Sequence, residues 1–431
     1  MWNRTPWPVF LATAVLLRPD AELGAQELLY AREYPVMRYA TRDLTNRVEE
    51  LRRMIGSGQA ELSFEPGRGY LVSLLASLDV PASSQMLVFS GTSLQEWIIS
   101  SDTPRAIYFA DDVYIAWLQG SDLLEIAAFD PNLGPVFYTL RQEKSDTPDF
   151  QRHTDLCLGC HDTYGLTGGG VPRFLIGSGP TDARGRMASH EGWRLTTDQT
   201  PLSRRWGGWY VTGTHGDQRH AGNIVVRASD DPAQPGEVTN GNRTDLSGLL
   251  DTDPYLTGNS DIVALMVAEH QIHVHNLLTR VNWEVRKLLD TQSGMAGQIA
   301  AIAEPLVRAM LFVNEATLSG AISGTSGFRS DFESRGPFDA DRRSLRHLDL
   351  TRRLFRYPMS FLVYSEAFEG LPTEAKEQVF QRVWEVLAGV DRSGEFDHLS
   401  EMDRSAILEI LRYTQGDFAR WLAESGAGEQ Q

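Results

Sequence analysis

The sequence predicts an α+β fold, with a strand-rich N-terminal half and an all-helical C-terminal half. Between residues 106 and 140, short apolar runs alternate with turn residues, as in an antiparallel meander. After residue 259, apolar residues instead recur at helical spacing through several long segments. Of the 431 residues, 42 % are hydrophobic, which is enough to build the cores of two or three domains.

The strand-rich half is expected to begin with a helix. Residues 41–55 combine helical spacing of apolar positions with a charged outer face. Strands are expected at 106–109, 113–118, 123–129 and 135–140. A second pair of strands, at 209–214 and 223–227, is expected to form a hairpin around a polar turn at Gly216-Asp217.

The helical half is expected to follow a loop at 229–259 that is rich in Asp, Gly, Pro and Asn. Ser260 is the expected cap of a long helix that ends near Leu289. Further helices are expected at 295–318, 373–389 and 400–422, and the last opens with the capping-box pattern Ser400-Glu401-Met402-Asp403. Residues 324–341 are expected to be a linker.

The N-terminus has the layout of a secretory signal peptide. A single positive charge at Arg4 precedes an apolar run at 8–17, and cleavage is expected after Ala25. The alternative is an uncleaved anchor, but a run of about ten apolar residues is too short to span a bilayer. We therefore expect a periplasmic or otherwise exported protein with no membrane span in the mature chain.

The chain has only two cysteines, and both lie in the sequence CLGCH at residues 157–161. A disulfide between Cys157 and Cys160 would close a very short loop and stabilise little. C-x-x-C is also the layout of thiol oxidoreductases, but the strand-to-helix setting of those motifs is missing here. A structural zinc site would need two further ligands from distant histidines. The fourth alternative, covalent haem attachment, uses both thiols and the adjacent His161.

On Cys157, Cys160 and His161 the chain resembles the haem attachment motif of the c-type cytochromes. The resemblance implies one covalent haem c, two thioether bonds, and His161 as an axial iron ligand; it also implies attachment outside the cytoplasm, which agrees with the expected export. In that family a downstream proline carbonyl often accepts a hydrogen bond from the iron-bound histidine, which makes Pro172 the candidate. The resemblance covers only the motif and its immediate surroundings.

With the motif placed, the sequence divides into four segments. They are a signal peptide at 1–25, a strand-rich haem-binding region at 26–232, a linker loop at 233–258 and a helical domain at 259–431.

The iron position opposite His161 decides the function. A second strong ligand closes the site and favours electron transfer, whereas an open position admits a peroxide, oxygen or another small molecule. The candidate ligands are His220, His215, Met187 and the pair His270 and His273 on the long helix.

His220 is the leading sixth ligand and second metal-binding residue, because Arg219 and Gly222 beside it could admit a haem propionate. His270 and His273 share a helix face, and together with Glu269 they are also an alternative second metal site.

These observations predict an exported monohaem c-type cytochrome that transfers single electrons. The net charge of −17 disfavours nucleic acid and favours a basic redox partner protein. The alternative is a haem enzyme of peroxidase or oxidase type, which the length of the chain favours, although no complete catalytic set is recognisable. A third hypothesis is a haem-bearing sensor or complex subunit whose helical half binds another protein.

Overall fold

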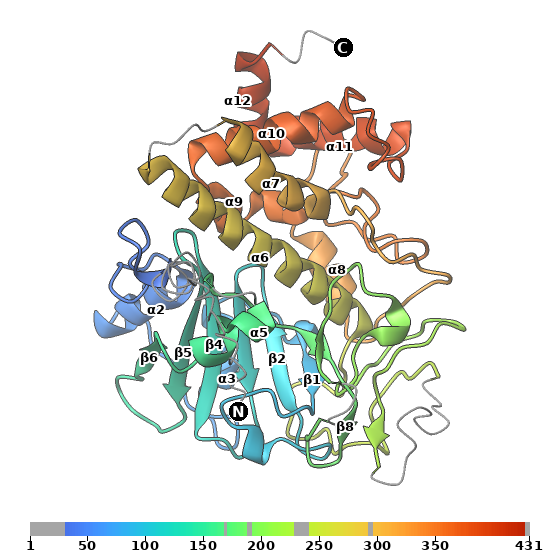
Figure 1. The fold of residues 1–431 in the computed structure, drawn as a ribbon. Helices are drawn as coiled ribbons and strands as arrows, with labels where there is room; N and C mark the ends of the chain where they lie inside the picture. Colours follow the sequence, from blue (N-terminus) through green and yellow to red (C-terminus); the bar gives the residue numbers. More distant parts are fainter. Residues whose placement is uncertain (1–30, 168–169, 188–191, 228–240, 292–295, 427–431) are drawn as a thin grey trace, which may run out of the picture.

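The computed structural model describes residues 31–167, 170–187, 192–227, 241–291 and 296–426. Within them the α+β class is confirmed: the N-terminal half forms a six-stranded antiparallel sheet and the C-terminal half is helical (Figure 1). The strands follow their sequence order across the sheet: β1 (Met86–Val88), β2 (Arg105–Phe109), β3 (Val113–Trp117), β4 (Leu123–Asp130), β5 (Gly134–Arg141) and β6 (Phe150–His153). The four strands expected between 106 and 140 are thus confirmed as β2 to β5. The expected signal peptide at 1–25 lies outside the described residues.

Short elements surround this sheet. The two-stranded pairs are β7 (Gly177–Ser178) with β9 (Arg194–Leu195) and β8 (Thr181–Asp182) with β10 (Val225–Val226). The 3-10 helices are η1 (Ala31–Glu33), η2 (Ala82–Ser84), η3 (Glu96–Ile98), η4 (Leu202–Arg204) and η5 (Phe361–Tyr364).

The helices α2 (Arg47–Gly56) and α3 (Leu71–Ser77) precede the sheet and contribute to the core beneath one of its faces. Asn46 caps α2 by accepting from the backbone of Glu49 at 3.1 Å, so this helix starts later than the expected residue 41. The Asn46 amide also donates to the Tyr138 hydroxyl of β5 at 2.9 Å, which ties the helix to the sheet.

The opposite face of the sheet is covered only in part. In β2 and β4, half-buried side chains alternate with buried ones, which is the period of two that a strand imposes. We call this area the half-open face; its members are Arg105, Ile107, Ala116, Glu125 and Ala127, all half-buried. Cross-strand pairing places Ile107 opposite Ala116 and Ala116 opposite Glu125.

The long helix α6 (Ile262–Asp290) packs against the end of the sheet where this face is closed. It runs between the sheet and the helix α7 (Ala296–Met310) (Figure 1). Its His275 ring lies 4.7 Å from the Phe129 ring of β4, and the Trp283 indole donates to the Leu133 carbonyl at 3.0 Å. One continuous cluster of buried side chains therefore joins the sheet, α6 and the helices beyond it.

The cap of α6 is Asp261, not the expected Ser260. The Asp261 carboxylate accepts from the backbone N–H groups of Val263 at 2.7 Å and Ala264 at 3.3 Å. The Ser260 hydroxyl instead donates to the Tyr210 carbonyl at 2.6 Å, so it is not available to the helix.

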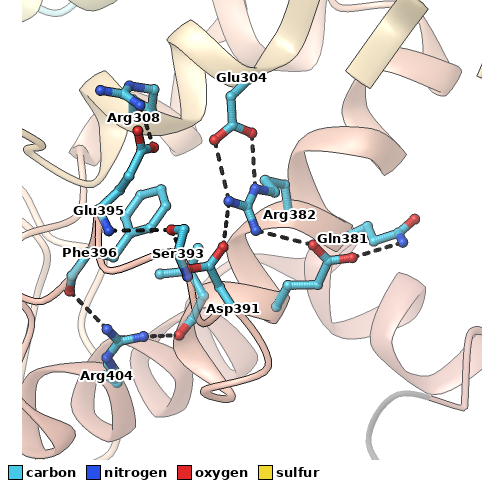
Figure 2. A network of polar contacts seen from close by, with 11 residues as sticks. Glu304, Arg308, Gln381, Arg382, Asp391, Ser393, Glu395, Phe396 and Arg404 are labelled. Carbon is cyan, nitrogen blue, oxygen red and sulfur yellow. Dashed lines mark hydrogen bonds and ion pairs between the residues drawn. The ribbon is translucent and has the colours of Figure 1, made fainter. Parts of the chain in front are cut away.

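The remaining helices are α4 (Leu158–His161), α5 (Tyr164–Thr167), α7 (Ala296–Met310), α8 (Phe328–Ser334), α9 (Glu366–Glu369), α10 (Thr373–Leu387), α11 (Glu401–Thr414) and α12 (Gly416–Glu424). The capping box at Ser400 and Asp403 is confirmed. Arg382 of α10 joins the helical layer by ion pairs to Glu304 of α7 at 2.9 Å and to Asp391 at 2.7 Å (Figure 2).

Three expectations about these segments are wrong. The hairpin at 209–227 does not form, because its first strand makes single bridges to separate partners, such as Trp209 with Val88 and Thr214 with Ser323. The expected linker at 324–341 contains α8, whose Phe328 packs on Phe109 of β2 with ring centroids 5.4 Å apart. The helix expected at 400–422 is two helices, because the Gln415 side chain caps α12.

His275 should make the free energy of unfolding depend on pH. Burial lowers the pKa of its imidazole from 6.5 to about 3. Between these values the unfolded chain binds a proton that the folded chain does not, so acidification destabilises the fold by about 1.4 kcal/mol per pH unit through this group. Denaturant titrations of His275→Leu between pH 6.5 and 4.5 should show a pH slope smaller by about that amount.

Tyr114→Phe is the matched control for this measurement. It removes the hydroxyl that lies 3.4 Å from His275 Nδ1 and keeps the titrating imidazole. Its pH slope should equal that of the wild type. An unchanged slope in His275→Leu would show that the imidazole is not held neutral by burial.

Candidate functional site

Cys157, Cys160 and His161 lie on one helical turn. Cys157 is the N-cap of α4, and its carbonyl accepts from the backbone N–H groups of Cys160 at 3.1 Å and His161 at 3.0 Å. Both cysteines are free, and Cys157 is buried whereas Cys160 is exposed. The turn therefore carries two unpaired thiols and presents an imidazole immediately after them.

A reciprocal pair of hydrogen bonds fixes the imidazole. His161 Nδ1 lies 2.7 Å from the Arg173 carbonyl oxygen, and the Arg173 N–H donates to the His161 carbonyl at 2.9 Å. Because a carbonyl only accepts, Nδ1 carries the proton and Nε2 keeps its lone pair. Metal-bound histidines in proteins are oriented in this way.

The expectation that the Pro172 carbonyl accepts from His161 is wrong. The acceptor is the carbonyl of the next residue, Arg173. The partner of His161 in the reciprocal pair must also donate a backbone N–H, and Pro172 has none. Arg173 provides both groups.

The His161 ring packs on Phe137 of β5, with ring centroids 4.3 Å apart. Burial lowers the pKa of His161 to about 4, although the bond to the Arg173 carbonyl opposes this shift. The imidazole is therefore neutral at pH 7, as a metal ligand must be.

The Cys157 thiol does not have the lowered pKa that thiol redox chemistry requires. Burial raises the pKa of Cys157 to about 12, whereas thiol oxidoreductases depend on a lowered pKa. Within the described part of the chain, no group of three or more His, Cys, Asp or Glu residues could hold a metal ion.

His220 lies in another part of the molecule. Its buried ring contacts Trp206, with ring centroids 5.4 Å apart. The neighbouring Trp209 bridges to Val88 of β1, at the opposite side of the sheet from the Phe137 strand β5. Adjacent strands lie about 4.8 Å apart, so four spacings separate β1 from β5 by roughly 19 Å. His220 thus contacts Trp206 and His215 on the β1 side of the sheet.

The other candidate sixth ligands are also placed elsewhere. His215 is buried next to His220 at a ring distance of 4.9 Å, and neither of its ring nitrogens has a hydrogen-bond partner among the described residues. Met187 is 40 % exposed and bridges to Thr181 of β8.

The two histidines on α6 are held by one buried carboxylate. Asp198 accepts from Nδ1 of His270 at 3.1 Å and from Nδ1 of His273 at 2.7 Å. His270 Nε2 also lies 2.9 Å from the Ser360 hydroxyl, so both nitrogens of this ring are bonded. Glu269 pairs with Arg205 at 2.9 Å instead of joining them. This arrangement is a buried hydrogen-bond network and not the alternative second metal site.

Burial alone would raise the pKa of Asp198, but the hydrogen bonds from His270 and His273 outweigh it and hold this pKa well below its usual range. Asp198 is therefore ionised at neutral pH and accepts from both rings.

Four residues near the motif were not found from the sequence. Phe137 has the pattern of an ordinary strand residue, and Arg173 follows the proline that was favoured instead. Arg105 and Glu125 of the half-open face form an ion pair at 3.0 Å, and both lie close enough to influence the pKa of His161. The pairing of strands brings them near the motif, which no local pattern encodes.

No protein-family model, no curated protein and no solved structure matches the chain. Within the described ranges, no helix is long and apolar enough to cross a membrane.

Replacing Asp198 by asparagine should lower the free energy of unfolding by about 3 kcal/mol, because an uncharged amide cannot accept fully from two imidazole N–H groups in a buried site. Denaturant unfolding at pH 7 measures this loss. Asp341→Asn is the control, since that side chain is 78 % exposed and its removal should cost less than about 0.5 kcal/mol. A loss below about 1 kcal/mol for Asp198→Asn would contradict the network.

Proposed function

We propose that this chain is an exported monohaem c-type cytochrome that transfers single electrons. The observation that carries the proposal is the neutral His161 imidazole, oriented by Arg173 on the same helical turn as two free thiols. Cys157 and Cys160 would hold the porphyrin through thioether bonds, and Nε2 of His161 would bind the iron. Haem, when bound, supplies the one-electron couple.

The residues around His161 then have defined roles. The Arg173 carbonyl fixes the orientation of the imidazole and makes it a stronger electron donor toward a metal. Phe137 packs on the ring and restricts its rotation. The net charge of −17 favours a basic redox partner, which would be steered toward the chain by long-range attraction.

Attachment can be tested on the full-length chain, co-expressed with a cytochrome maturation system. We expect the intact mass to increase by one haem and the band on a denaturing gel to stain for haem, because thioether bonds survive denaturation. Cys157→Ser/Cys160→Ser should abolish both signals. Leu156→Ala is the matched control beside the motif; that side chain is 60 % exposed and should leave attachment unchanged. A wild-type chain without added porphyrin would end the proposal.

A second candidate function is a haem enzyme of peroxidase or oxidase type. It is favoured because Asp198 holds Nδ1 of both His270 and His273, and His220 contacts Trp206 rather than His161. The absorption spectrum of the reduced protein with and without carbon monoxide separates the two functions. A rapid spectral change indicates an open distal position and favours the enzyme, whereas an unchanged spectrum indicates a closed site and an electron carrier.

His220→Ala tests the sixth ligand directly. On the geometry described here, we expect the spin state and the midpoint potential of the matured protein to stay as in the wild type. A change in either would show that His220 reaches the iron in the haem-bound chain.

A further inference from the structure

The half-open face begins immediately beside the His161 site. Ala127 of β4 is the cross-strand neighbour of Phe137, the residue on which the imidazole packs. On the other side of Ala127, Tyr114 of β3 is its partner, so a small side chain stands between two aromatic ones. Ala116 and Ile107 continue the apolar surface across β3 and β2. All three of these smaller residues are half-buried, although the other face of the same strands is buried.

Arg105 carries an unsatisfied donor on this face. Its Nη1 pairs with Glu125 at 3.0 Å, but its buried Nε has no hydrogen-bond partner among the described residues. A buried guanidinium N–H without an acceptor is costly, and a carboxylate is the acceptor that matches a guanidinium best. The Arg105 charge also acts on His161, where it favours the neutral imidazole.

We propose that the half-open face is the wall on which the attached porphyrin packs, and that Arg105 binds one of its propionates. This inference rests on the proposed function. The apolar side chains Ile107, Ala116 and Ala127 would contact the macrocycle, because each is only half-buried on this face. The positive charge of Arg105 at one end of the half-open face matches the polar edge of a porphyrin, whose carboxylates lie on one side of the ring.

The test uses the full-length chain with Cys157→Ala/Cys160→Ala, which cannot form thioethers and so reports non-covalent contacts. Titration with haemin, followed by absorbance, gives the dissociation constant of this parent. Adding Ala127→Trp fills the proposed wall, and adding Arg105→Gln removes the propionate partner. Each should weaken haemin binding by about tenfold, the factor expected for the loss of one charge-assisted hydrogen bond or of a comparable apolar contact.

Two controls make the outcome specific. Arg141→Gln changes an arginine at the end of β5 that is 63 % exposed, and it should bind haemin like the parent. His161→Ala should weaken binding, because it removes the ligand itself. Circular dichroism checks folding, and Ala127→Leu replaces the tryptophan variant if that variant is unfolded.

The failure of this inference can be told apart from failure of the proposed function. If the matured wild-type chain carries haem and His161→Ala weakens haemin binding, while Ala127→Trp and Arg105→Gln bind like the parent, the porphyrin lies elsewhere and only the inference is overturned. If the matured wild-type chain carries no haem, the proposed function itself fails.

Discussion

The site depends on the reciprocal hydrogen bonds between His161 and Arg173. They join two residues 12 positions apart in the chain, set the tautomer of the imidazole and hold its ring against Phe137. Without them, a histidine at the end of a four-residue helix would have free rotation and either tautomer. The motif supplies two thiols and an imidazole. The hydrogen bond from His161 Nδ1 to the Arg173 carbonyl then determines that Nε2 of the imidazole keeps its lone pair.

Buried hydrogen bonds also join the two halves of the chain. α6 buries His270, Gln271 and His275, and each finds its partner outside the helix: Asp198, Ala110 and Tyr114 respectively. Buried polar groups without such partners are strongly destabilising. The helix is therefore held in one register against the sheet, and that register decides which end of the sheet face is closed and which end stays half-open beside His161.

Elements formed by local interactions can be predicted from the sequence, whereas contacts between distant segments cannot. The meander and α6 are predictable, because alternation and helical periodicity are local, and so is the capping box at Ser400. The absence of the hairpin at 209–227 is not predictable, because residues of its expected first strand bridge to distant residues such as Val88 and Ser323. The three motif residues are adjacent in the chain, whereas Phe137 and Arg105 reach the site only through strand pairing. The motif residues can therefore be recognised from the sequence, whereas the residues that surround them in the fold cannot.

His161 also differs from the other histidines in the hydrogen bonds of its ring. His220 Nδ1 accepts from the Gly222 N–H at 3.0 Å, and burial lowers the pKa of this ring to about 3. Its neutral form must therefore carry the proton on Nε2, which leaves neither nitrogen with a lone pair for a metal. In His270, both nitrogens are bonded to Asp198 and Ser360. His161 differs because its protonated Nδ1 faces a carbonyl, which leaves the lone pair on Nε2. The direction of one hydrogen bond thus distinguishes His161, the iron ligand of the proposed function, from His220 and His270.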